Sequence, residues 1–263
     1  MALITKLNEE VTDETLPKLG YLRYYPQNTD GSINSVRFNN GLWGVKVEFI
    51  GDGYLCDSSG NEIPSFETQV NDVTFYYKST GGFVQISKKY DLSYVAVSVT
   101  DGKGTFVDID ELDHCTQMNY FSVSYGNSYG HLKSINVFKD TATVNIRSTL
   151  IVGDLSEISH KKFVNLSIRY MRRLTGDLSE MPLDVASAYN SIEFNGCLNI
   201  SVTAQQLGKF VNATSIIMTT NNVTYSDIAD ALFANGKVSG SVSIRDGSST
   251  KTCTFTSSGW TAT

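Results

Sequence analysis

The sequence predicts a mainly β protein whose larger part is a solenoid with a parallel sheet. A Gly-Asp-Leu-Ser-Glu segment at 153–157 recurs at 176–180, and short alternating apolar runs recur at a similar spacing. Charged residues make up only 18% of the 263 residues, so there is ample apolar material for a core. Self-similarity at a period of about 20–50 residues is typical of repeat architectures, in which each unit buries its apolar face against its neighbours.

Residues 1–22 are predicted to form an N-terminal arm. The segment is acidic, with Glu9, Glu10, Asp13 and Glu14, and it lacks the alternation of a strand or the periodicity of a helix. Residues 23–82 are predicted to form a small antiparallel β unit, because alternating runs such as 43–49 are separated by Gly-Asp and Ser-Gly turn signals. Solenoids expose an apolar end unless it is capped, so this unit is expected to act as a cap domain.

Residues 83–263 are predicted to form the solenoid and its C-terminal cap. The period is 23–25 residues, and each unit has an acidic turn with the pattern of a helix N-cap followed by a short strand. In the last segment, 252–255 is expected to pair as a final strand and Trp260 to cover the last coil. The predicted strands carry alternating apolar residues at Val95/Val97/Val99, Phe121/Val123, Val144/Ile146, Leu166/Ile168, Ile192/Phe194, Ile216/Met218 and Val242/Ile244.

Enzymatic, cofactor, metal, nucleic-acid and membrane functions are not expected. The histidines, His114, His131 and His160, lie in no metal-ligand or catalytic motif, and no nucleophile elbow or phosphate-binding loop is present. The acids of the repeat, such as Asp154 and Asp177, recur with the period and are therefore expected to cap turns. A net charge of −6 and a pI near 5.1 leave no basic footprint for nucleic acid. No run approaches the length of a membrane helix.

The outer face of the predicted sheet is the candidate binding surface. On each strand the apolar residues face inward, so the residues between them face outward. A polar stripe with an aromatic side chain at its edge fits a protein partner or a glycan on a host surface. The alternative is that Arg169 and Glu193 only form a cross-strand pair, which is a structural role. The predicted binding residues are Asn145, Arg147, Arg169, Tyr170, Glu193 and Asn195.

Two segments resemble known protein families. Residues 163–176, with Leu166, Ile168, Met171 and Leu174 at the apolar positions, resemble a leucine-rich repeat in which Met171 stands at the usual Asn position. The Gly-Asp-Leu-Ser-Glu junction is similar to divergent repeats of Bacteroides-type gut bacteria and their phages. The resemblance implies a right-handed leucine-rich-repeat-like solenoid. The acidic arm, ending in Leu-Pro-Lys-Leu-Gly-Tyr-Leu, is similar to the opening of structural proteins in tailed phages of Bacteroides, including the crAss-like phages.

These resemblances imply a non-enzymatic virion protein, namely a head fibre, a capsid decoration or a tail fibre. It would be assembled in the cytoplasm of a bacterial host and attach through residues 1–22 to capsid or tail proteins. A homo-oligomer, dimer or trimer, is expected because small β units with open edges usually need partners. The alternative is a bacterial surface-adhesion or glycan-binding leucine-rich-repeat module. That alternative predicts a secretion or lipoprotein signal, and residues 1–20 have no apolar segment of that kind.

Overall fold

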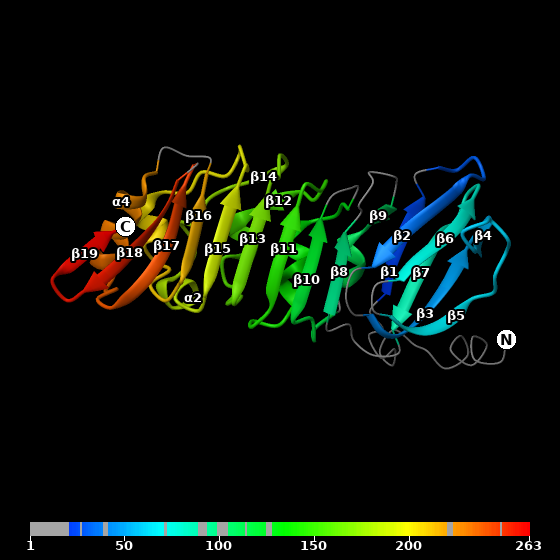
Figure 1. Cartoon of the computed structure of the whole chain (residues 1–263), viewed down its shortest axis with the longest axis horizontal. Coiled ribbons are helices and arrows are strands. Elements are labelled where there is room, and N and C mark those ends of the chain that lie inside the picture. Colours follow the sequence, from blue (N-terminus) through cyan, green and yellow to red (C-terminus); the bar gives the residue numbers. More distant parts are fainter. Residues whose placement is uncertain are drawn as a thin grey trace.

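The computed structural model in Figure 1 is elongated, with two antiparallel sheets at one end and one large sheet along the rest. The described residues are 21–26, 28–38, 42–70, 73–88, 94–98, 105–113, 115–124, 128–219, 223–247 and 249–263. The predicted arm lies outside them except for its last two residues. Tyr21 and Leu22 begin the first strand, β1, and pair with β7, so these two residues belong to the antiparallel part.

The N-terminal part contains a five-stranded and a three-stranded antiparallel sheet. Their facing sides carry aromatic residues, and Phe49 and Phe66 of the first sheet pack against Tyr77 and Phe75 of the second. The five-stranded sheet has the order β5 (Phe66–Val70), β3 (Leu42–Ile50), β7 (Phe83–Lys88), β1 (Tyr21–Pro26), β9 (Thr105–Val107). The three-stranded sheet has the order β2 (Ile33–Phe38), β6 (Val73–Ser79), β4 (Gly53–Cys56).

The antiparallel part extends beyond residue 82, the end of the predicted cap domain. Strand β7 lies between β3 and β1, and β9 pairs with the other side of β1. Without β9 that side of β1 would be an open edge. The chain reaches β9 only after it has placed β8 (Tyr94–Ser98) in the large sheet. The two parts therefore interleave in sequence, and this corrects the predicted boundary.

The large sheet has nine strands and is mixed. Seven of its strands, β8, β10, β11, β13, β15, β16 and β17, are parallel, and a C-terminal antiparallel segment of β17, β18 and β19 completes the sheet (Figure 1). The alternating apolar runs predicted from the sequence all lie in these strands, although Val99 is outside the described residues. The order is β8, β10 (Tyr120–Ser124), β11 (Thr143–Arg147), β13 (Asn165–Arg169), β15 (Ser191–Asn195), β16 (Ser215–Met218), β17 (Gly240–Asp246), β18 (Ser249–Thr256), β19 (Gly259–Ala262).

The parallel strands pair in register without a slip. Consecutive units are 22 to 28 residues apart, a wider range than the predicted 23–25. The longest unit, between β16 and β17, contains the only helix of ten residues in the described part of the chain. Because each inward residue faces the inward residue of the next strand, the apolar rows are continuous. The same register also aligns the residues that alternate with the apolar ones. One such row runs through Tyr94, Tyr120, Thr143, Asn165, Ser191, Ser215 and Ser243.

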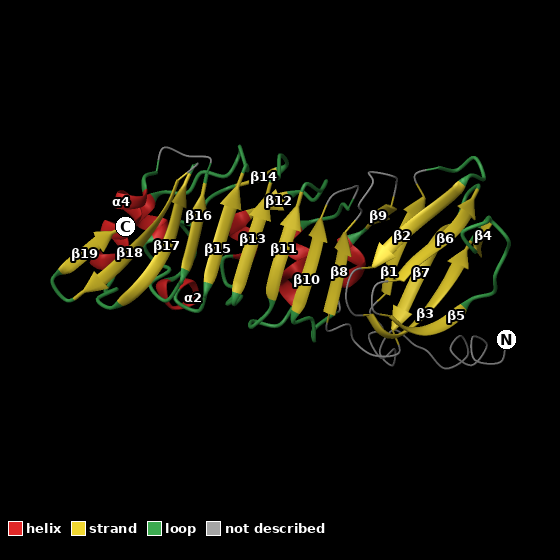
Figure 2. Cartoon of the chain, in the orientation of Figure 1, coloured by secondary structure: helices red, strands yellow, loops and turns green. Residues whose placement is uncertain are grey.

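Short helices cover one face of the large sheet, as Figure 2 shows. Apolar residues of the helices and strands enclose a core that includes Phe121, Phe163, Tyr189 and Phe194. A second parallel ladder, β12 (Gly153–Asp154) with β14 (Leu174–Thr175), links the turns of two units. The helices are η1 (Ile109–Leu112), η2 (Leu132–Val137), η3 (Leu155–Ile158), α2 (Leu183–Ala186), α3 (Ala204–Leu207) and α4 (Tyr225–Ala234).

The repeated Gly-Asp pair has a packing explanation. Asp154 caps η3 by accepting from the amide of Ser156, as the N-cap pattern predicts. Gly176, one unit later, has φ +97° and lies against that carboxylate, so a Cβ there would be 2.4 Å from Asp154 Oδ1. Gly153 and Gly130 also have positive φ and close contacts with the preceding unit. In these three units the glycine leaves room for the close contact with the unit before it, whereas Val107, Val202 and Val223 precede the caps of η1, α3 and α4.

At the C-terminal end, residues 252–255 lie in a strand as predicted, but they are not the final strand, because β19 follows and contains Trp260. The strand of residues 252–255 is β18, and Trp260 packs partly buried against the core. Its indole Nε1 donates to Asp230 Oδ1 at 2.8 Å, and its ring lies edge-on to Tyr225 at 6.3 Å.

Among the described residues, no helix has both the length and the apolar character needed to cross a membrane. The four cysteines are buried free thiols, as lone cysteines predict, and burial raises the pKa of Cys197.

Candidate binding face

The predicted binding residues lie on the outer face of the large sheet, in two rows instead of one stripe. Arg147 pairs in register with Arg169 on the next strand, and Arg169 pairs with Asn195. Two residues earlier on each strand, Asn145 and Glu193 flank Ser167 in the other row. The register therefore places two arginines side by side near the ends of β11 and β13. Like charges opposite each other are unfavourable unless each finds a partner.

Arg169 finds its partner in Glu193. Its Nη2 and Nε lie 2.6 and 2.7 Å from Glu193 Oε2, and Ser167 Oγ donates to the same oxygen at 2.7 Å. The Glu193 side chain is only 10% exposed, whereas that of Arg169 is 40% exposed. The cross-strand pair left open by the sequence is therefore present. Arg169 covers the acid and presents its own outer side to solvent.

Tyr170 lies between the neighbouring units. Its ring is 5.4 Å from the Arg147 guanidinium carbon, which is a cation–π distance. On the other side a Cβ at Gly196 would be 2.4 Å from Tyr170 Cδ1, so the ring occupies the space that a side chain would need. Tyr170 has φ +53° and is 47% exposed. Ser148 and Gly196, at the same position in the neighbouring units, also have positive φ, so this conformation belongs to the turn after each of these strands.

The two asparagines differ in their partners. Asn195 Oδ1 accepts from Thr219 Oγ1 at 2.8 Å, and that hydroxyl accepts in turn from the amide of Gly196 at 3.0 Å. Within the described part of the chain, Asn195 Nδ2 and the side chain of Asn145 make no hydrogen bond. Both are half-buried, and Thr219 fixes the orientation of the Asn195 amide. Their N–H groups remain available as donors to a bound molecule.

Three residues of this region were not predicted from the sequence: Arg172, Arg173 and Leu198. They lie in the turns that follow β13 and β15, beside Tyr170. Leu198 is 74% exposed, and Asn199 Nδ2 ties its turn to the carbonyl of Arg172 at 2.7 Å. The available signal was an Arg-Arg pair two residues after Tyr170 in an acidic chain. We call Leu150, Tyr170, Arg172, Arg173 and Leu198 the downstream ridge.

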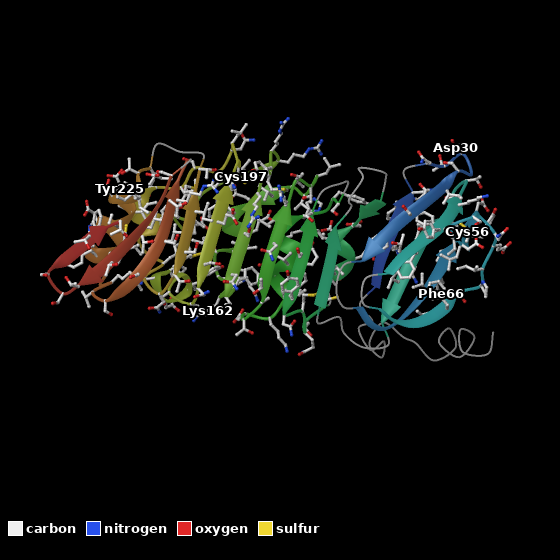
Figure 3. The ribbon with its side chains drawn as sticks, viewed as in Figure 1. Asp30, Cys56, Phe66, Lys162, Cys197 and Tyr225 are labelled. Carbon is white, nitrogen blue, oxygen red and sulfur yellow. The ribbon has the colours of Figure 1, made fainter. Side chains whose placement is uncertain are left out.

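Figure 3 shows the downstream edge of the large sheet near Cys197, which marks the turn after β15. Side chains ending in nitrogen project beyond this edge. The turn itself is held by Cys197 Sγ, 3.3 Å from the carbonyl oxygen of Ile168. Both arginines of the turn after β13 are exposed, and neither forms an ion pair with a described residue. The ridge is therefore cationic and partly apolar on a rigid support.

The acidic turns have a structural role. Hydrogen bonds from Ser156 lower the pKa of Asp154, and hydrogen bonds from Ser179 lower that of Asp177. Asp110 accepts from Ser134 Oγ and lies 2.7 Å from His131 Nδ1. Because the serine donates to the carboxylate and not to the imidazole, these three residues lack the nucleophile–base contact of a hydrolase. His160 is an exposed turn residue, and His114 is outside the described residues.

Comparisons with protein-family models, curated proteins and solved structures gave no match.

Proposed function

We propose that this chain is a non-enzymatic structural and binding protein, built as a right-handed leucine-rich-repeat-like solenoid. The observation that carries the proposal is the in-register parallel ladder with a fixed polar outer face. Such a ladder is a rigid support, because each unit is held on both sides by its neighbours. The side chains on it are ordered before any partner arrives, which favours binding.

The setting of this function is a phage virion, in which the protein is a head fibre, a capsid decoration or a tail fibre. The similarity of the N-terminal arm to tailed-phage structural proteins supports this setting. In this arrangement the arm attaches to capsid or tail proteins and the solenoid faces outward, with a dimer or trimer as the assembled form. The capping role of Asp154 and Asp177 supports a protein without catalytic acids.

A bacterial surface-adhesion or glycan-binding module is the second candidate. The downstream ridge favours it, because arginine and tyrosine beside an exposed leucine are typical of recognition surfaces. The two candidates share the binding face and differ in what holds the protein in place.

Deletion of residues 1–20 tests the virion setting, since the strand β1 begins at Tyr21 and remains intact. The intact chain and residues 21–263 are each mixed with purified crAss-like phage capsids and sedimented. We expect the intact chain to sediment and the truncated chain to stay in solution. Circular dichroism of the truncated chain confirms that it is folded. If neither form binds capsids, the virion setting is wrong and the adhesion candidate replaces it.

A further inference from the structure

The downstream edge of the large sheet has the opposite charge to the whole molecule. Four arginines lie there, namely Arg147, Arg169, Arg172 and Arg173, in a chain whose net charge is −6. Among the described residues of β10, β11, β13, β15 and β16 the only acid is Glu193, which is almost buried and bound by Arg169. Arg172 and Arg173 are exposed and form no ion pair with a described residue, so their positive charge favours an anionic partner at this edge.

The arginines also have a regular placement. Arg147, Arg169 and Asn195 lie in one row, with one residue on each of three adjacent parallel strands. Adjacent strands are about 4.8 Å apart, which is close to the length of one pyranose residue in an extended polysaccharide. A sugar chain that crosses the strands therefore meets one planar, hydrogen-bonding side chain for each sugar. Arginine is suited to sugars that carry a carboxylate, because its guanidinium donates two parallel hydrogen bonds to it.

The site is ordered in advance. Glu193 fixes Arg169, Tyr170 stacks on Arg147, and Thr219 orients Asn195. Little side-chain entropy is therefore lost when a ligand binds. Tyr170 and Leu198 supply exposed apolar surface for the C–H faces of sugar rings.

We propose that this edge binds a linear polysaccharide whose sugars carry carboxylates, laid across β11, β13 and β15 with Arg172 and Arg173 at its margin. This inference rests on the binding role proposed above and names the ligand class of the same face. An acidic protein surface would also satisfy the charge. The polysaccharide is favoured because a row with one donor per strand matches a polymer with one repeating unit per step.

The test uses the full chain and three soluble probes: polygalacturonate, its methyl ester and dextran sulfate. Affinity is measured by biolayer interferometry at about 0.15 M salt, where long-range attraction is screened beyond about 8 Å. We expect the intact chain to bind polygalacturonate. We expect at least tenfold weaker binding to the methyl ester, which has the same sugars without the charge.

A pair of matched variants locates the site. Arg172→Gln/Arg173→Gln removes two positive charges from the downstream ridge. Lys139→Gln/Lys162→Gln removes two exposed positive charges from the loops before β11 and β13. We expect the arginine variant to bind polygalacturonate at least tenfold more weakly and the lysine variant to bind like the intact chain. All four residues are exposed, and unchanged thermal unfolding confirms that both variants fold.

Several outcomes would overturn the inference. Equal losses in both variants, or tighter binding of dextran sulfate than of polygalacturonate, would show attraction by charge alone. No binding of polygalacturonate would remove this ligand class. A change of sedimentation coefficient in the arginine variant alone would identify a second copy of the chain as the occupant. None of these outcomes alters capsid co-sedimentation, so failure here is distinguishable from failure of the virion proposal.

Discussion

The parallel sheet and the antiparallel sheets of this protein are both made of short strands, but they connect the chain over different distances. In the parallel sheet each strand pairs with the strand one unit, 22 to 28 residues, away. In the antiparallel part Tyr21 lies opposite Ser87 and Tyr24 lies opposite Val107. Some antiparallel pairs, such as β3 with β5, also join near neighbours, but β1 pairs only with segments that are far away in sequence. The parallel sheet therefore forms from near neighbours throughout, whereas the five-stranded sheet also needs distant pairs. Distant pairing slows folding, because loop-closure entropy is lost before the contacts form.

The two regions are joined at β1 and the first repeat unit. Arg23 Nη1 lies 2.7 Å from Glu111 Oε1 of η1, and the ring of Tyr25 lies 6.3 Å from that of Tyr129. An unfolded N-terminal part would remove these contacts from one end of the ladder only. We therefore expect a destabilising mutation in the parallel sheet to unfold only the units near it. A destabilising mutation in the antiparallel part should unfold that whole part.

The largest expected effect is the loss of stability when a buried aromatic ring is removed from either region. Phe194→Ala in β15 and Phe75→Ala in β6 each remove a buried ring, and each should destabilise the protein by about 3–5 kcal/mol. Amide hydrogen exchange shows which part of the chain each mutation destabilises. We expect Phe194→Ala to raise exchange mainly in β13, β15 and β16, and Phe75→Ala to raise it in both antiparallel sheets. Uniform loss of protection across the chain in both variants would contradict the comparison.

A smaller effect tests the contact between units. Gly176→Ala places a Cβ against the Asp154 carboxylate in a backbone of positive φ, and it should cost about 2–3 kcal/mol. Gly236→Ala is the matched control, because Gly236 has φ +95° and no atom within 4 Å of its Cβ position. We expect the control to lose only about 1 kcal/mol in urea unfolding. Equal losses would mean that backbone strain alone explains the glycine.

A third prediction compares two ion pairs. Arg169–Glu193 lies within the ladder, and Arg23–Glu111 joins the two regions. Double-mutant cycles with Arg→Met and Glu→Gln should each give a coupling energy of about 1 kcal/mol, since the arginines are partly exposed. Only the Arg23–Glu111 cycle should change exchange at the junction of the regions. A coupling energy near zero for Arg169–Glu193 would show that Ser167 alone stabilises the acid.

The smallest effect concerns the caps. Asp154→Asn should lower stability at pH 7 by about 0.5–1 kcal/mol, because the amide keeps only one oxygen to accept from Ser156 and Thr175. Hydrogen bonds depress the pKa of Asp154 in the folded chain, so its contribution is present above about pH 4 and is lost as the pH falls through the folded pKa. Thermal unfolding at pH 7 and pH 3 checks this. The difference between the variant and the intact chain should shrink at pH 3.

The sequence predicted the strands of the ladder well. Residue pairs such as Leu166/Ile168 and Ile192/Phe194 alternate because one side of each strand is buried, and that signal is local. The pairing of β9 with β1 was not predictable, because three residues carry no alternation and the partner lies far away in sequence. The length of the last parallel unit, 28 residues from Ser215 to Ser243, also exceeds the predicted period, because this unit contains the ten-residue helix α4.

The candidate site was predicted in composition but not in arrangement. Alternation placed Arg147, Arg169 and Glu193 on the outer face, and the register placed them in two rows. The position of Tyr170 against Gly196 depends on backbone conformation after the strands, which no sequence period encodes. The same holds for Arg172 and Arg173, whose exposure follows from the turn they occupy.

The in-register ladder also relates the length of the molecule directly to its number of units. Each unit adds one strand, so each unit separates the antiparallel sheets from the β18–β19 hairpin by about 4.8 Å more. Duplication or loss of a single unit would change the reach of the protein by that fixed step and leave both ends intact. The length between two attachment points is therefore a quantity that selection can adjust in small, equal increments, without redesign of either end.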